Sequence, residues 1–149
     1  MCKLFLKHMN FLHIKEGDIF SSSCRVIVNP VNCKGIEETT INKIVNQKFP
    51  EVKELYKEQC EKNYIAIGSL WLYKNILFFP TRSKEEMYNK IENIEVGLNA
   101  FLRCYESLKI TSIAFPLLTE GITKYDKPLI LPLMQDKLKF CKSYIEIYK

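Results

Sequence analysis

The sequence predicts an α/β fold in which a mixed β-sheet carries helices on both faces. Short apolar or β-branched runs at Val26–Val28 and Ser112–Phe115 are typical of buried strands, and segments with helical periodicity separate them. Two further strand-like runs, Ile65–Tyr73 and Asn75–Phe79, are joined by a very short turn at Lys74-Asn75, which favours a hairpin. Strands separated by helices, together with one hairpin, predict a mixed sheet between helical layers.

The remaining elements can be placed in order along the chain. A helix is expected to begin at Thr39 or Thr40, since either side chain can cap it, and to bury the apolar residues that follow at helical spacing. Asn63 tolerates a left-handed conformation and is expected to end a second helix. The other predicted elements are a first strand at Phe11–Ile14, the second helix from Val52 to Cys60, a long helix from Tyr88 to Leu108, a last helix from Pro128 and a closing strand at Tyr144–Tyr148.

Composition limits the classes of function. The chain has 149 residues, of which 47% are hydrophobic, and this suits one globular domain. Its net charge of +5 is scattered along the sequence, so only a mild attraction to anionic ligands follows. Six cysteines far apart predict free thiols in a reducing, cytoplasmic compartment, and two isolated histidines predict no metal site. No apolar run is long enough to span a membrane.

Polar residues at strand ends predict a ligand pocket. Asn29 and Asn32 follow the strand at Val26–Val28 and precede Gly35. Open α/β sheets bind ligands just past the carboxyl ends of their strands, so these amides are expected to form one wall. The loop 117–127 would form a second rim. Asp18 follows the first strand in a turn, where it can cap a helix or accept a hydrogen bond from an exocyclic amine of a ligand, and both interpretations stay open.

With these residues in view, the chain resembles a macro domain, and within that family the subgroup that includes the antitoxin of the DarT/DarG pair and the terminal ADP-ribose protein glycohydrolase. The order and spacing of the motifs cover residues 10–149 and leave 1–9 as an N-terminal extension. The motifs are G-D-I-F from Gly17, V-I-V-N-P-V-N from Val26, F-P-E-V-x-x-x-Y-x-x-x-C from Phe49, I-G-S-L-W-L-Y from Ile67, F-P-T from Phe79, I-E-N-I-E-V-G-L from Ile91, I-T-S-I-A-F-P from Ile110 and P-L-M from Pro132.

The resemblance implies a three-layer α/β/α fold with a mixed central sheet, a pocket for ADP-ribose and no cofactor. The family's adenine-contacting aspartate falls on Asp18, beside the Ile19 backbone, and its ribose-facing asparagine falls on Asn32. A neutral amide suits vicinal hydroxyls because it both donates and accepts. The complete set of ligand-binding residues that the resemblance implies is Asp18, Ile19, Asn29, Asn32, Gly35, Thr81, Arg82, Thr119, Glu120, Gly121, Ile122 and Thr123.

Three departures from the family pattern bear on activity. In the first phosphate loop, Glu38 and Thr40 replace glycines, and a carboxylate there would oppose a pyrophosphate by on the order of 1 kcal/mol. In the second loop, Thr123 stands where the hydrolases carry a catalytic aspartate, and Asp126 follows three residues later. Arg82 takes the place of the catalytic lysine, although an arginine cannot serve as nucleophile or base. Lys84, two positions on, is expected to point to the same side as Arg82.

These observations leave three hypotheses for function. The first is a non-catalytic macro domain, a pseudoenzyme that binds ADP-ribose or a related adenine nucleotide as a reader of modified macromolecules or as a nucleotide sponge. The second is an ADP-ribosyl glycohydrolase that acts on modified DNA or protein through Lys84 or Asp126. The third is a protein-interaction module with a closed pocket, in which Glu37 and Glu38 only form the solvated start of a helix. The acidic residues after Lys84 argue against DNA as a partner.

Overall fold

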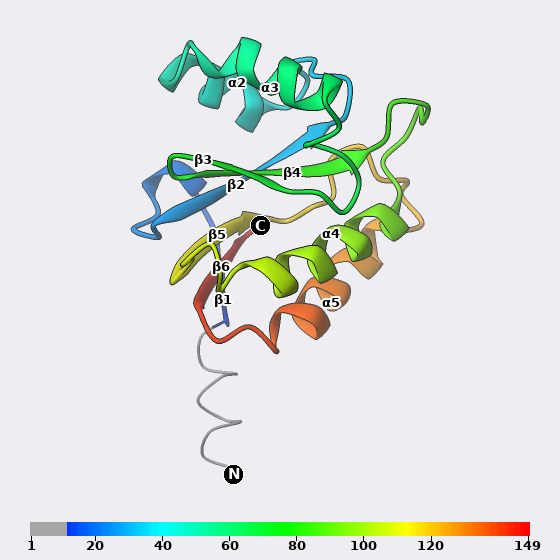
Figure 1. The fold of residues 1–149 in the computed structure, drawn as a ribbon. Coiled ribbons are helices and arrows are strands. Elements are labelled where there is room, and N and C mark those ends of the chain that lie inside the picture. Colours follow the sequence, from blue (N-terminus) through cyan, green and yellow to red (C-terminus); the bar gives the residue numbers. More distant parts are fainter. Residues whose placement is uncertain (1–11) are drawn as a thin grey trace, which may run out of the picture.

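The computed structural model describes residues 12–149, which form a six-stranded sheet between two helical layers (Figure 1). Helices α2 and α3 cover one face, and α4 and α5 cover the other, which confirms the predicted three-layer α/β/α fold. The elements are β1 Leu12–Lys15, the short 3-10 helix η1 Ile19–Ser21, β2 Val26–Asn32, α2 Thr40–Lys48, α3 Val52–Glu61, β3 Trp71–Tyr73, β4 Ile76–Arg82, α4 Ile91–Cys104, β5 Ser112–Pro116, α5 Lys127–Leu138 and β6 Tyr144–Tyr148.

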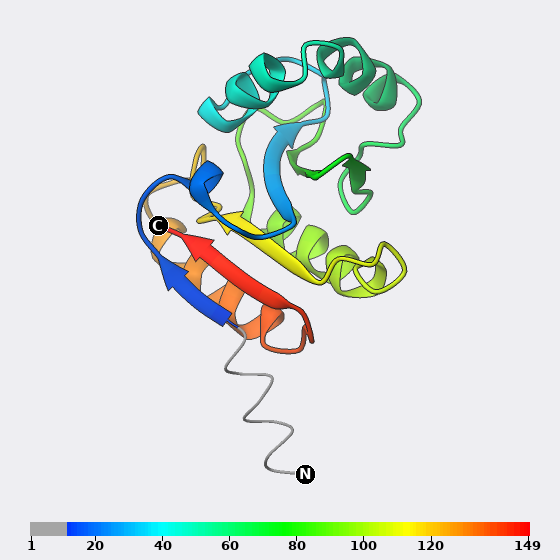
Figure 2. The same cartoon turned by 90° about the vertical axis from the view of Figure 1, so that its left-hand side faces the viewer.

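The strand order is β1-β6-β5-β2-β4-β3, and all neighbours are parallel except β3 and β4. The antiparallel pair forms because Lys74 takes a left-handed conformation with φ of 52° and reverses the chain between Tyr73 and Ile76. The sheet is therefore mixed, as predicted. Figure 2 shows the first strand, β1, lying beside the last, β6, at the edge of the sheet opposite β3.

Strand β2 separates two cores because its side chains alternate between the faces of the sheet. Val26 and Val28 join the cluster under α4 and α5, whereas Ile27 and Val31 join the cluster under α2 and α3. In the first cluster α4 approaches the sheet closely at Gly97, where an added Cβ would lie 2.5 Å from Cζ of Phe79. Both faces of β2 are thus buried, which explains its nearly continuous apolar sequence.

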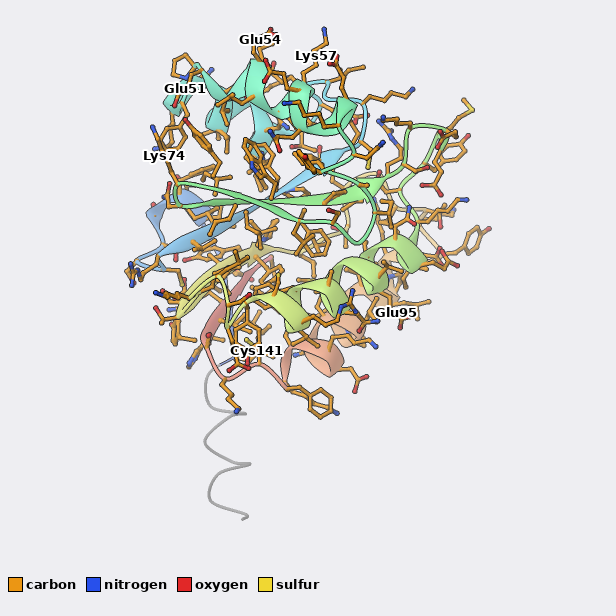
Figure 3. All side chains as sticks on the ribbon, in the orientation of Figure 1. Glu51, Glu54, Lys57, Lys74, Glu95 and Cys141 are labelled. Carbon is orange, nitrogen blue, oxygen red and sulfur yellow. The ribbon has the colours of Figure 1, made fainter. Side chains whose placement is uncertain are left out.

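The two helices on the first face match their predicted limits. Thr39 caps α2, and its hydroxyl accepts a hydrogen bond from the backbone N–H of Asn42. Asn63 follows the end of α3 with φ of 60°, the expected left-handed conformation. The start of α3 is tied to the β3–β4 turn, because Lys74 Nζ lies 3.1 Å from Glu51 Oε2, and Figure 3 shows the two residues on the same edge of the molecule.

Two elements are shorter than predicted. The strand expected at Ile65–Tyr73 forms only as β3, since Gly68 has φ of 81° and residues 65–70 fold into a turn closed by the bridge between Ala66 and Ser69. The helix expected from Tyr88 begins at Ile91. Glu86 accepts hydrogen bonds from the backbone N–H of Ser83 and from Asn93 Nδ2, and this fixes a turn just before the helix.

Strands β2 and β4 extend beyond their predicted ends at Val28 and Phe79, to Asn32 and Arg82. The remaining elements lie within about two residues of their predicted positions, and α4 ends at Cys104, four residues early. Lys109, at φ of 57°, carries the chain out of the turn that follows this helix. Phe11 and the expected extension 1–9 lie outside the described residues. Within 12–149, no helix combines the length and apolar character of a membrane span.

Candidate functional site

A cleft lies at the carboxyl ends of β2, β4 and β5, where the parallel strands meet the loops. It consists of three adjoining cavities, which we call the first compartment, the neck and the second compartment. The first compartment, about 230 Å³, is lined by Gly17, Asp18, Ile19, Phe20, Thr40, Ile41, Ile44, Pro116, Tyr148 and Lys149. The neck, about 30 Å³, is lined by Pro30, Thr39, Ile41, Thr81, Asn89, Pro116, Leu117, Leu118 and Glu120. The second compartment, about 220 Å³, is lined by Val31, Asn32, Glu38, Thr39, Thr81, Arg82, Asn89, Glu120 and Gly121.

A larger cavity of about 470 Å³ lies elsewhere, between β1 and α5. Leu12, the first described residue, and Ile14 line it from β1. The cleft is the better site because its walls come from the loops at the carboxyl ends of parallel strands, where open α/β sheets bind ligands.

Asp18 shapes the rim of the first compartment. Its Oδ1 accepts a hydrogen bond of 2.9 Å from the backbone N–H of Phe20, so it is the N-cap of η1. The capping interpretation is therefore confirmed. The residue also lines the compartment, and a carboxylate has a second oxygen that can accept from a ligand amine. The two interpretations that the sequence left open are compatible.

A buried carboxylate supports this rim from below. Glu146, in β6, is 4% exposed, and its oxygens accept hydrogen bonds from the hydroxyls of Ser22, Tyr144 and Tyr148 at 2.6 to 2.9 Å. Burial would raise the pKa of Glu146, but the hydroxyl donors outweigh it and bring the pKa to about 2. Ser22 ends η1, and Tyr148 lines the first compartment. Glu146 thus joins the rim to the sheet.

An irregularity in the sheet places Arg82 in the second compartment. Val31 pairs with Pro80 and Asn32 pairs with Arg82, so Thr81 is an extra residue on β4. Such bulges often occur next to functional sites, where they re-aim a side chain. Here the bulge brings Arg82 opposite Asn32, and the backbone N–H of Cys33 donates to the Arg82 carbonyl at 3.0 Å.

Asn32, Glu38 and Arg82 form one hydrogen-bonded cluster in the second compartment. Arg82 Nη2 lies 2.7 and 2.5 Å from the two carboxylate oxygens of Glu38. Asn32 Nδ2 donates to Glu38 Oε2 at 2.8 Å. Partial burial would raise the pKa of Glu38, but Arg82 and Asn32 favour the charged form, and the net result is a lowered pKa. The acidic side chain therefore lies inside the site and is not merely part of a solvated helix start.

Tyr56, from α3, supports Asn32 from the core. Its hydroxyl lies 2.6 Å from the Asn32 backbone oxygen and 3.0 Å from Asn32 Oδ1. Burial raises the pKa of this phenol, so it remains a neutral donor. The loop after Asn32 also approaches α3 closely, because Gly35 has φ of 76° and an added Cβ there would lie 2.7 Å from the Lys57 Cα. Gly35 is thus required for packing against α3.

A hydrogen bond crosses the cleft at the neck. Asn89 Nδ2 donates to the Glu120 carbonyl at 2.7 Å, and both residues line the neck and the second compartment. Next to them, Gly121 has φ of 77°, and an added Cβ there would lie 2.8 Å from Asn89 Nδ2. The bond joins the loop after β4 to the loop after β5 and narrows the passage between the compartments.

The structure gathers some of the predicted site residues and separates others. The residues that line the cleft are Asp18, Ile19, Asn32, Thr81, Arg82, Glu120 and Gly121. The remainder do not line it: Asn29, Gly35, Lys84, Thr119, Ile122, Thr123 and Asp126. The prediction that the asparagines follow the strand is wrong, since both lie within β2, where backbone pairing with β4 extends the strand to Asn32.

The predicted site residues that do not line the cleft have other surroundings. Asn29 is fully buried, and neither polar atom of its side chain has a hydrogen-bond partner among the described residues. Ile122 belongs to the core under α4 and α5. The Thr123 carbonyl accepts a hydrogen bond from the backbone N–H of Asp126 in the turn before α5. The prediction that Lys84 points to the same side as Arg82 is wrong. The chain turns at Ser83, and Lys84 Nζ donates to Asn63 Oδ1 at 3.3 Å.

Sequence reasoning missed Tyr56, Asn89 and Glu146 as parts of the site. Tyr56 belongs to the quoted F-P-E-V-x-x-x-Y motif, but its helical spacing indicated only a core position. Asn89 fell inside the helix predicted from Tyr88. Glu146 alternates with apolar residues in the last strand, and an acidic residue at such a position is a signal that the sequence does offer.

Comparison with known proteins places the chain in a family. The model of the Macro domain family matches residues 28–134, and the chain belongs to this family. Among solved structures, the macrodomain of Thermus aquaticus DarG has a TM-score of 0.82 at 23% identity, covering 93% of this chain and 97% of that chain. The Thermosipho africanus DarTG in complex with ADP-ribose has a TM-score of 0.81 at 25% identity, covering 91% of this chain and 41% of that chain.

Curated relatives carry enzyme names. The DNA ADP-ribosyl glycohydrolase of Mycobacterium tuberculosis is 28% identical over 114 residues, which cover 71% of this chain and 32% of that protein. The DNA ADP-ribosyl transferase-DNA ADP-ribosyl glycohydrolase fusion protein of Thermosipho africanus is 26% identical over 160 residues, covering 92% of this chain and 41% of that protein. The chain thus spans about a third to two fifths of the length of these two bacterial relatives.

Proposed function

We propose that this macro domain binds ADP-ribose or a related adenine nucleotide in the cleft, with the adenine in the first compartment and the distal ribose toward Asn32. The observation that carries the proposal is the pair of compartments, about 230 and 220 Å³, joined by a neck at the carboxyl ends of the parallel strands. A nucleotide with a polar group at each end of a diphosphate matches this shape. Asp18 in the first compartment supplies an acceptor suited to the adenine amino group.

The surroundings of the candidate catalytic residues favour binding without turnover. Arg82 stands at the position of the family's catalytic lysine, and its guanidinium stays protonated and paired with Glu38. Lys84 and Asp126 do not line the cleft. A general base or nucleophile must come within hydrogen-bond reach of the reacting atom, and neither side chain offers this here. On this basis the domain acts as a reader or as a nucleotide sponge.

The second candidate is an ADP-ribosyl glycohydrolase. Its support is the name shared by the bacterial relatives, one of which is 28% identical over 71% of this chain. On this proposal Lys84 or Asp126 moves into the cleft when the modified DNA or protein binds. The third hypothesis, an interaction module with a closed pocket, draws on the narrow neck of about 30 Å³, since that volume holds about one water molecule.

Calorimetry with ADP-ribose and AMP, followed by incubation with ADP-ribosylated DNA and protein, separates the candidates. Binding of ADP-ribose that Asp18→Asn weakens, without release of ADP-ribose from either substrate, supports the reader. Release of ADP-ribose that Lys84→Ala or Asp126→Ala abolishes would establish the hydrolase in its place. If neither nucleotide produces a heat of binding and thermal stability is unchanged at millimolar ligand, the closed interaction module is left.

A further inference from the structure

We infer that Glu38 competes with the distal part of the nucleotide for Asn32 and Arg82, and that it thereby sets the preference of the cleft between short and long ligands. The inference rests on the proposed function and adds a determinant of specificity to it. Glu38 holds the side-chain groups of Asn32 and Arg82 that a ligand in the second compartment would need.

The hydrogen-bonding capacity of Asn32 is fully used within the protein. Its two amide protons go to the Ile36 carbonyl at 2.9 Å and to Glu38 Oε2 at 2.8 Å. Its Oδ1 accepts from the backbone N–H groups of Lys34 and Ile36 and lies 3.0 Å from the Tyr56 hydroxyl. A side-chain amide has two donor protons and two acceptor lone pairs, so a ribose hydroxyl can bond Asn32 only by replacing one of these partners.

Among these partners, Glu38 is the one most easily replaced. Ile36 and Lys34 contact Asn32 through backbone groups of a tight loop, and Tyr56 is buried under α3. The side chain of Glu38, by contrast, is 47% exposed and can rotate into solvent. Its partner Arg82 is only 19% exposed and stays in the compartment as a permanent cation. Displacement of Glu38 therefore frees one donor on Asn32 and one charged donor group on Arg82 together.

This arrangement makes the cost of displacing Glu38 depend on ligand length. AMP, placed with its adenine against Asp18, ends at the neck and leaves the Glu38 contacts in place. ADP-ribose reaches the second compartment and must break them. A partly exposed ion pair and one charge-assisted hydrogen bond oppose it by about tenfold in affinity. Glu38 thus discriminates against ligands that extend past the neck, unless they bring a group that binds Arg82 more strongly.

Glu37 provides a matched control for this test. It carries the same charge one residue earlier in the same loop, but it faces Asn46, whose Nδ2 donates to Glu37 Oε1 at 2.8 Å. Calorimetry should compare AMP and ADP-ribose on the wild type, Glu38→Ala and Glu37→Ala. We expect Glu38→Ala to bind ADP-ribose about tenfold more tightly than Glu37→Ala does, with equal affinity of the two variants for AMP. Glu38→Gln should fall between the wild type and Glu38→Ala.

The other outcomes each overturn the inference in a recognisable way. Equal gains from Glu38→Ala and Glu37→Ala would mean that only net charge matters, and weaker ADP-ribose binding by Glu38→Ala would mean that Glu38 supports the ligand. If the wild type and both variants fail to bind either nucleotide, the proposed function fails with the inference. A second measurement needs no ligand: the Asn32 side-chain amide resonances, assigned with Asn32→Asp, should shift in Glu38→Ala and not in Glu37→Ala. Unchanged resonances would exclude the contact in solution.

Discussion

The hydroxyl of Tyr56 lies 2.6 Å from the backbone oxygen of Asn32, and this contact connects the core under α2 and α3 to the ligand cleft. The two residues are 24 positions apart in sequence. Because Asn32 is the last residue of β2, a donor at this point fixes the strand end from which the side-chain amide reaches into the second compartment.

We expect Tyr56→Phe to destabilise the fold by about 1–3 kcal/mol, since it removes a buried hydroxyl whose single proton lies within reach of both the backbone oxygen and Oδ1 of Asn32. It should also weaken ADP-ribose binding, because the Asn32 amide loses its support. Tyr105→Phe is the matched control: its hydroxyl accepts the Lys142 backbone N–H far from the cleft. Urea unfolding should show losses for both variants, and calorimetry should show weaker binding for Tyr56→Phe alone. Equal binding by both would contradict the supporting role.

Asp18→Asn separates capping from recognition. Asparagine caps helices as well as aspartate does, so the unfolding free energy should stay within about 0.5 kcal/mol of the wild type. The affinity for AMP should fall about tenfold, because the new amide N–H₂ faces the adenine amino group. Inosine monophosphate, which presents a carbonyl at that position, should bind the variant better than it binds the wild type. Unchanged AMP affinity would remove Asp18 from the recognition of adenine.

Glu146 should make stability depend on pH in acid. Its folded pKa of about 2 lies below the value of about 4.3 for an unfolded glutamate, so its stabilisation is present above about pH 4.3 and is lost as the pH falls toward 2. We expect Glu146→Gln to be less stable than the wild type at pH 7, by about 1–3 kcal/mol, and the difference to shrink between pH 4.5 and about 2.5.

Urea unfolding at several pH values measures this difference. Glu51→Gln is the control, since Glu51 also accepts hydrogen bonds from a tyrosine and a lysine, Tyr73 and Lys74, but on the surface. A smaller effect is expected there because solvent screens the pair. If the gap between Glu146→Gln and the wild type stayed constant down to pH 2.5, the buried carboxylate would not be the source of it.

Gly97→Ala tests the close contact between α4 and the sheet. An added Cβ would lie 2.5 Å from Phe79 Cζ, so the helix or the ring must move, and overpacking of this kind costs about 1–3 kcal/mol. The smaller leucine side chain in Phe79→Leu should leave room for the added methyl group. A double-mutant cycle should therefore give a favourable coupling between the two changes. Additive losses would show that Phe79 already has room to yield.

The fold could be predicted from sequence because its signals are local. The cap at Thr39, the left-handed Asn63 and the turn at Lys74 each depend on a few neighbouring residues, and each stands as predicted. The failures also have local causes that periodicity does not report. Apolar residues from Ile65 to Leu70 suggested a strand, but Gly68 turns the chain there. Hydrogen bonds around Glu86 delay the start of α4.

The candidate site could be predicted only in part because its contacts join distant segments. The pair of Glu38 and Arg82 spans 44 positions and depends on the bulge at Thr81, for which the sequence offers no marker. The Asn89–Glu120 hydrogen bond spans 31 positions and needs both loops in place. Motif matching identified Asp18 and Asn32 as lining residues, but it gave no sign that Asn32 already has all its partners inside the chain.

The last residues of the sequence are part of the cleft. Tyr148 and Lys149 line the first compartment, and the Lys149 backbone N–H donates to the Lys15 carbonyl at 3.0 Å. Any polypeptide joined to Lys149, whether natural chain or affinity tag, starts at the mouth of the proposed adenine site. Protein for binding experiments should therefore be purified with a removable tag at the other end of the chain, so that the measured affinity reports the cleft and not an appended sequence at its entrance.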